Sequence, residues 1–189
     1  MPHVVKAGSG RQIGAILDCA APSDQFFLLM RLALYQPDIP QNTGTILRLA
    51  ACMGRGVDII EPAGFDLSDR ALKRAALDYL SYVRIQCHDD FEQFRRAARS
   101  GGSRIVLLSS RGKTPYTKFR FESNDTLMLG RESAGVPMSV FEAIEESVVI
   151  PIQAPLRSLN VAVAAAMVLG EAMRQVYWIG NSSASVKRD

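Results

Sequence analysis

A stretch near the start of the chain, LYQPDIPQNTGTILRLAA (34–51), places an amide and an arginine where a strand would pass into a helix. Asn42 follows two prolines, and Arg48 lies about 200° around the helical pattern from Ile46, away from its apolar face. The carboxyl end of a strand that opens a helix is where α/β proteins bind ligands. An arginine there can hold a phosphate by a bidentate contact. Two plainer explanations stay open: Asn42 as a helix N-cap and Arg48 as a solvent-facing side chain.

Two later stretches have the same strand-to-helix form. LMLGRESAGVP (127–137) carries Glu132 between glycines, and glycine lets a ligand approach the backbone closely. VVIPIQAPLRSLNVAVAAA (148–166) carries Ser158 and Asn160 just before an apolar helix. Two polar candidates exceed what one helix N-cap requires. Taken alone, each stretch also fits an ordinary connecting turn, and neither is a Walker loop or a dinucleotide-binding fingerprint.

The composition is that of a globular protein with one domain. The chain has 189 residues, of which 48% are hydrophobic and 22% charged, with a formal net charge of +3. Three separated cysteines suggest neither a disulfide framework nor a zinc site, and two histidines argue against a His-based metal site or catalytic triad. We therefore predict no metal. No apolar stretch approaches the roughly 20 residues needed to span a bilayer, and no secretory signal is recognisable, so a cytoplasmic location is expected.

Basic residues are concentrated between Gln93 and Phe121, where every charged residue is basic and aromatic residues are interleaved near the end. Basic side chains neutralise phosphates and aromatic rings stack on bases, which favours a nucleic-acid partner. A solvated helix face followed by a basic loop explains the same pattern equally well. A second group shares one helix face at i, i+3 and i+4 spacing and has the same two explanations: Arg70, Lys73 and Arg74.

Alternating strand and helix patterns predict an α/β fold with a mainly parallel sheet and helices on both faces. The predicted strands are Arg31–Tyr35, Val57–Glu61, Tyr82–Cys87, Arg104–Ser109, Thr126–Leu129 and Val148–Ile152, and the predicted helices are 43–54, 68–79, 89–99, 137–145 and 159–176.

The predicted domain covers residues 30–178, between a flexible extension (1–29) and a frayed tail (179–189). The last predicted helix is apolar on every side from Val161 to Leu169, which requires cover on several sides. A partner subunit is a natural cover in so small a chain. We therefore expect a homodimer.

Together and in this order, the three stretches resemble the three motifs of the SPOUT, or α/β-knot, methyltransferases over about residues 31–178. Within that family, LYQPDIPQNTG, IIEPAGFDLSDRALKRAALDY and RSLNVAVA resemble the small tRNA 2′-O-methyltransferases of the TrmL type. The resemblance implies S-adenosylmethionine-dependent methylation of the ribose 2′-OH of the wobble nucleotide, cytidine-34 or 5-carboxymethylaminomethyluridine-34, in the anticodon stem-loop of tRNA. Two alternatives stay open: a relative that methylates another tRNA or rRNA ribose, and an RNA-binding relative without methyltransferase activity. The N-terminal extension and QAPLRS depart from the family pattern.

The resemblance also implies a C-terminal trefoil knot and a homodimer. It implies that S-adenosylmethionine is held mainly by backbone groups at Leu108, Gly130, Ile150 and Ser158. Arg48 would be the base or a phosphate clamp, and Asn42 would brace the first motif against the third. The implied catalytic residues are Arg48, Asn42, Glu132, Ser158 and Asn160, and the candidate RNA contacts are Arg70, Lys73, Arg74, Arg111 and Lys113.

Overall fold

The computed structural model describes residues 30–66 and 70–178. The predicted flexible extension (1–29) and the predicted frayed tail (179–189) lie outside the described residues, as do residues 67–69.

A seven-stranded sheet lies at the centre of the fold, in the order β3-β2-β1-β6-β4-β7-β5. Every pairing between these strands is parallel, which confirms the prediction of an α/β fold with a parallel sheet. The strands are β1 (Arg31–Tyr35), β2 (Gly56–Ile60), β3 (Ile85–His88), β4 (Arg104–Leu108), β5 (Thr114–Pro115), β6 (Asp125–Leu129) and β7 (Glu146–Val149).

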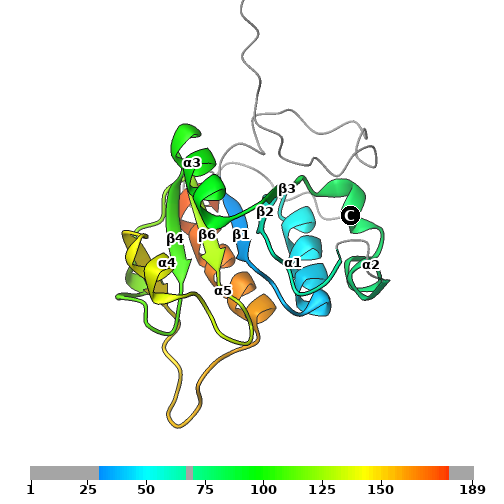
Figure 1. The fold of residues 1–189 in the computed structure, drawn as a ribbon. Helices are drawn as coiled ribbons and strands as arrows, with labels where there is room; N and C mark the ends of the chain where they lie inside the picture. The colour runs from blue at the N-terminus through cyan, green and yellow to red at the C-terminus, as the bar shows by residue number, and fades with distance from the viewer. Residues whose placement is uncertain (1–29, 67–69, 179–189) are drawn as a thin grey trace, which may run out of the picture.

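Helices cover both faces of this sheet, as predicted. Along β1, Leu32 and Leu34 belong to one hydrophobic cluster, which includes residues of the helices α1 (Pro40–Cys52), α2 (Arg70–Ala76) and α5 (Val161–Met173). Ala33 and Tyr35 belong to a second cluster, with residues of α3 (Phe91–Ser100) and α4 (Met138–Glu142). Because side chains alternate along a strand, the two clusters lie on opposite faces. Figure 1 shows α1 beside α2, and the long yellow-orange loop after β7 that projects from one edge of the molecule.

Several predicted boundaries differ from the structure. The strand predicted at Tyr82–Cys87 begins later, because a 3₁₀ helix, η1 (Leu77–Tyr82), includes Tyr82, and β3 begins only at Ile85. β7 ends at Val149 instead of Ile152, two residues before Pro151, which has no N–H to donate to a sheet. α1 begins at Pro40 instead of residue 43, since proline is favoured in the first helical turn. The two-residue strand β5 was not predicted.

A close crossing of α1 and α2 positions the middle of α1. A Cβ added at Gly44 would lie 2.6 Å from the Cβ of Ala75 and 2.8 Å from the carbonyl oxygen of Leu72, so no larger residue fits there. One helical turn later, the guanidinium of Arg48 lies 5.1 Å from the ring centroid of Tyr79 in η1. The crossing therefore holds Arg48 beside η1.

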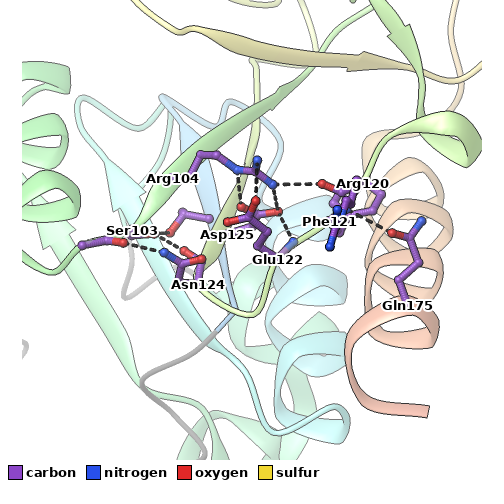
Figure 2. Close-up of polar contacts among 10 residues, drawn as sticks. Ser103, Arg104, Arg120, Phe121, Glu122, Asn124, Asp125 and Gln175 are labelled. Atoms are coloured by element: carbon purple, nitrogen blue, oxygen red, sulfur yellow. Dashed lines mark hydrogen bonds and ion pairs between the residues drawn. The ribbon is translucent and has the colours of Figure 1, made fainter. Parts of the chain in front are cut away.

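Hydrogen bonds from two other elements hold residues 119–125, the segment that leads into β6 (Figure 2). Arg104 donates to the two carboxylate oxygens of the fully buried Asp125 at 2.7 and 2.9 Å. Gln175, in the π-helical end of the last helix, η3 (Arg174–Trp178), accepts from the Phe121 N–H at 3.0 Å. Its side-chain amide also donates to the Phe119 carbonyl at 3.0 Å. These contacts tie residues 119–125 to both β4 and the C-terminal helix.

Candidate active site

A cavity of about 450 Å³ opens beside the carboxyl ends of β6, β4 and β7, three neighbouring strands. This volume is in the range of small-molecule sites in proteins, which is roughly 300–1,000 Å³. Apolar side chains of the strand ends line one part of it. The polar lining comes from all three motifs and from the end of β4: Asn42, Ser109, Ser110, Arg131, Glu132, Arg157, Ser158 and Asn160.

The structure brings together most of the residues expected to act in catalysis or cofactor binding. The four expected cofactor contacts all line the cavity: Leu108, Gly130, Ile150 and Ser158. Four of the five expected catalytic residues line it as well: Asn42, Glu132, Ser158 and Asn160. The exception is Arg48, which is exposed on α1 and does not line the cavity. Exposure is what the solvent-facing explanation predicts, so its catalytic role stays a prediction.

A chain of side-chain hydrogen bonds joins the three motifs. Asn42 Nδ2 donates to Glu132 Oε1 at 3.2 Å, and Asn160 Nδ2 donates to Asn42 Oδ1 at 2.9 Å. Asn160 Oδ1 also accepts from the N–H groups of Ala162 and Val163, so this residue caps α5. The expected brace between the first and third motifs is therefore present in the geometry.

The possibility that Asn42 is a helix N-cap is wrong. The N-cap position of α1 is Ile39, and Asn42 lies within the first turn, because the helix already begins at Pro40. Its side chain is consequently available for contacts with Glu132 and Asn160.

Asp38 is a site residue that the sequence analysis missed. Its N–H donates to Glu132 Oε2 at 3.1 Å, its Oδ1 accepts from the Glu132 N–H at 3.2 Å, and its Oδ2 accepts from the Ser133 hydroxyl. The hydrogen bond with Glu132 lowers the pKa of Asp38 to about 2. Burial, and then the hydrogen bond with Asp38, raises the pKa of Glu132. The one signal in the sequence was an aspartate between two prolines, Pro37 and Pro40.

A tight loop after β6 forms one wall of the cavity. Arg131 and Gly135 exchange two backbone hydrogen bonds, at 3.0 and 2.9 Å, and Gly135 has a φ of +67°, where glycine is favoured. A Cβ at Gly130 would lie 2.8 Å from the carbonyl carbon of Gly135. The glycines of the second motif are therefore required by this close backbone approach, and they leave backbone groups at the cavity wall.

The candidate RNA contacts come from two separate parts of the fold, α2 and the segment after β4. Arg70 and Arg74 are exposed on α2, whereas the side chain of Lys73 lies outside the described part of the chain. Arg111 donates to the Val136 carbonyl at 3.0 Å, and its guanidinium lies 5.0 Å from the ring centroid of Phe141.

Two further basic residues of the stretch 93–121 also have partners within the protein. Lys113 Nζ lies 3.5 Å from the Glu145 carbonyl. Arg104 is held by Asp125, so it stabilises the fold instead of offering a free charge to RNA (Figure 2).

Within residues 30–66 and 70–178, no group of three or more His, Cys, Asp or Glu side chains is arranged to hold a metal ion. Nor does that part of the chain contain a helix of the length and apolarity needed to cross a membrane. The expectation that no metal is used stays a prediction.

Comparisons with known proteins agree with this site. The model of the SpoU rRNA Methylase family matches residues 29–170. A tRNA (cytidine(34)-2′-O)-methyltransferase of Beijerinckia indica subsp. indica is 59% identical over 145 residues, which are 77% of this chain and 91% of that protein.

Two solved structures have the same fold. One, described as "Structural insights into the 2-OH methylation of C/U34 on tRNA", is 42% identical with a TM-score of 0.74 and covers 77% of this chain and 95% of that one. The other is the SpoU methyltransferase AviRb from Streptomyces viridochromogenes in complex with the cofactor AdoMet. It is 27% identical with a TM-score of 0.69, over 76% of this chain and 59% of that one. The resemblance drawn from three motifs is thereby confirmed: the chain belongs to the SpoU methylase family of SPOUT methyltransferases.

Proposed function

We propose that this protein is an S-adenosylmethionine-dependent tRNA 2′-O-methyltransferase that methylates the ribose of nucleotide 34. The observation that carries the proposal is the hydrogen-bonded chain from Glu132 through Asn42 to Asn160, which joins all three motifs at the lining of one cavity. Relatives named tRNA (cytidine(34)-2′-O)-methyltransferase, one of them 59% identical, support the choice of substrate.

The cavity fits S-adenosylmethionine as the methyl donor. Leu108, Gly130 and Ile150 bring the ends of three adjacent strands to its wall, and Gly130 has no side chain that would keep a ligand from its backbone. Ser158 adds a hydroxyl from the third motif. When bound, the cofactor supplies an activated methyl group on a sulfonium.

The protein has to align the ribose 2′-oxygen with the methyl group and assist the loss of its proton. We assign the positioning to Asn42, Glu132 and Asn160, because their hydrogen bonds fix one another across the site. Arg48 is assigned to the RNA. A guanidinium stays protonated in proteins, so holding the target phosphate is a more suitable role for Arg48 than acting as a base. Its exposure leaves it accessible to a bound tRNA.

Residues 30–178 form the proposed catalytic domain, and its C-terminal part is proposed to contain a trefoil knot. Support comes from the strand order: β4 and β5 are consecutive in sequence, but β7, which comes later, lies between them in the sheet. The connection from β4 to β5 therefore passes across the position that β7 later occupies in the sheet. Residues 1–29 are proposed to be dispensable for the chemistry, so a protein beginning at Met30 is expected to fold and methylate tRNA.

We also propose a homodimer that uses the outer side of α5. Val163, Ala166 and Met167 are exposed on α5 at the spacing of one helix face. A second copy of this chain is the proposed cover. The opposite side of α5 is already covered within the same subunit, because Ala165, Val168 and Leu169 are all buried in the core.

The test is methylation of tRNA transcripts by the purified protein with S-adenosylmethionine, followed by digestion and mass spectrometry of nucleotide 34. We expect one 2′-O-methyl group on cytidine-34 of a transcript, or on the modified uridine-34 of tRNA purified from cells. A transcript with 2′-deoxycytidine at position 34 is the matched control and should accept none. Methylation at another ribose would favour the alternative tRNA or rRNA activity. Absence of S-adenosylmethionine binding in calorimetry would favour a non-catalytic RNA-binding protein.

A further inference from the structure

Arg131 lines the cavity without a partner of its own. Its Nε is buried and has no hydrogen-bond partner among the described residues. No carboxylate of that part of the chain forms an ion pair with its guanidinium. A buried N–H of a charged group that is left unpaired costs free energy. The position of Arg131 therefore fits an anion that the folded chain does not itself provide.

The adjacent Glu132 does not fill this role. Its Oε1 accepts from Asn42 Nδ2 at 3.2 Å, and its Oε2 accepts from the Asp38 N–H at 3.1 Å. The same Asp38 holds the backbone of Glu132 and the hydroxyl of Ser133. Both carboxylate oxygens of Glu132 thus accept hydrogen bonds from the first motif, and neither accepts one from Arg131.

The backbone around Arg131 is fixed before any ligand arrives. Two hydrogen bonds between Arg131 and Gly135 close the loop, and the contacts of Asp38 hold the next two residues. A side chain that begins on so constrained a backbone, with a buried Nε, has little freedom to move toward a partner outside the cavity. Its anion should lie within the cavity.

A small-molecule anion fits this position better than an RNA phosphate does. RNA approaches from outside, where the exposed Arg48, Arg74 and Arg157 are accessible to its backbone. Arg131 instead directly follows Gly130, at the end of β6, where the cofactor is expected. S-adenosylmethionine carries one carboxylate, on its methionine part, and a guanidinium binds a carboxylate through charge-assisted hydrogen bonds.

We propose that Arg131 binds the α-carboxylate of the methionine part of the methyl donor and thereby makes the site select the complete cofactor over its adenosine part. This inference rests on the proposed function, because it requires the cofactor to occupy the cavity.

The test compares two ligands by calorimetry: S-adenosylhomocysteine, and 5′-methylthioadenosine, which keeps the adenosine and sulfur but lacks the carboxylate. Arg131→Gln is expected to weaken S-adenosylhomocysteine binding by about 10- to 100-fold, the effect of losing a hydrogen bond to a charged group. Its affinity for 5′-methylthioadenosine should stay within about 2-fold. Arg131→Lys keeps the charge and should lose less. Arg96→Gln, which removes an exposed arginine of α3 that does not line the cavity, is the matched control and should change both affinities little.

The other outcomes are distinguishable. Equal loss of both ligands in Arg131→Gln and Arg131→Lys would show a general effect on the cavity and overturn the proposal. Unchanged S-adenosylhomocysteine binding, together with weaker tRNA binding that depends less on salt, would assign Arg131 to an RNA phosphate instead. A wild-type protein that binds neither ligand would overturn the proposed function, and this inference with it.

Discussion

Asn160 and Asn42 lie 118 residues apart in the sequence, yet Asn160 Nδ2 donates to Asn42 Oδ1 at 2.9 Å. The oxygen of the same Asn160 side chain caps α5 through two backbone N–H groups. One side chain therefore both begins the last helix and connects the third motif to the first.

Asn160→Asp separates these two roles, because aspartate is as good an N-cap as asparagine but has no N–H to donate to Asn42. We expect its melting temperature to stay close to that of the wild type and its methylation rate to fall by roughly tenfold or more, since the site loses its alignment. Asn160→Ala loses both roles and should also lose about 1 kcal/mol of stability. Thermal melts and single-turnover methylation measure both effects. Wild-type activity in Asn160→Asp would show that the link to Asn42 is unimportant.

Arg48→Ala is expected to remove most methylation without harming the fold. Arg48 is exposed, and its one described contact is with the ring of Tyr79, so the stability change should be within about 0.5 kcal/mol. Cofactor affinity should not change, because Arg48 does not line the cavity. Arg48→Lys keeps the charge without the planar fork and should have intermediate activity. Calorimetry, melting and methylation assays decide the matter: an unfolded variant, or one with near-wild-type activity, contradicts this assignment.

Glu132→Gln is expected to change the pH dependence of stability. The pKa of Glu132 is raised in the folded protein, so folding favours its protonated form, and wild-type stability is lost as pH rises through that folded-state pKa. Glutamine is neutral and keeps an oxygen that can accept from Asn42. The variant should therefore be as stable as the wild type or more stable at pH 8, with lower activity. Denaturant unfolding between pH 4 and 8 provides the measurement. The free energy of unfolding of the variant, relative to that of the wild type, should rise from pH 4 to pH 8, and a fall would refute this explanation.

Asp58→Asn is expected to destabilise the protein strongly at neutral pH. Asp58 accepts from Arg31 Nε at 2.6 Å and lies 2.8 Å from His88 Nε2 in the interior. Burial raises the pKa of Asp58, but these hydrogen bonds outweigh it and hold the pKa below the ordinary value of 3.8. Removing one partner from a buried ion pair costs about 3–5 kcal/mol.

The sign of the pH effect follows from the lowered pKa. The contribution of Asp58 is complete above the ordinary value of 3.8 and is lost as pH falls through the folded-state pKa. The stability gap between wild type and Asp58→Asn should therefore narrow on acidification below about pH 4. Denaturant unfolding at pH 7 and below pH 4 tests this, and a gap that is constant with pH would rule out the charge of Asp58 as its cause.

Local patterns in the sequence were sufficient to predict the parallel sheet and the polar candidates of the three motifs, whereas the cofactor contacts at Leu108, Gly130 and Ile150 were implied by the family resemblance. Alternation along β1, apolar spacing in α1 and the polar pair Ser158 and Asn160 are all features of short segments. The contact between Asp38 and Glu132 joins residues 94 apart, so no local pattern marks it. The insertion of β7 between β4 and β5 is likewise a property of the whole chain path.

The same limit explains why the sequence left two explanations open for the basic stretch 93–121. Composition counts Arg104 as a free charge, but the buried Asp125 that binds it lies 21 residues further along the chain. The basic surface available to RNA can be estimated only after residues paired with buried carboxylates, such as Arg104, are left out.

The final prediction concerns the exposed face of α5, where Val163 is 50% and Met167 is 37% exposed. Apolar burial is worth about 25 cal/mol per Å², so a second copy that covers this face would gain stability from it. Met167→Glu should therefore convert the dimer into a monomer while each subunit stays folded. Ser139→Glu, which places the same charge on an exposed position of α4, should leave the dimer intact.

Ala165, by contrast, is only 1% exposed, so Ala165→Glu would disturb the core of each subunit and cannot probe the interface. Sedimentation velocity at low micromolar protein, combined with thermal melts, separates dissociation from unfolding. Because tRNA contacts from a second subunit would be lost with the dimer, Met167→Glu should also bind tRNA more weakly while keeping its affinity for S-adenosylhomocysteine. A wild-type protein that sediments as a fully active monomer would leave the apolar face of α5 without this explanation.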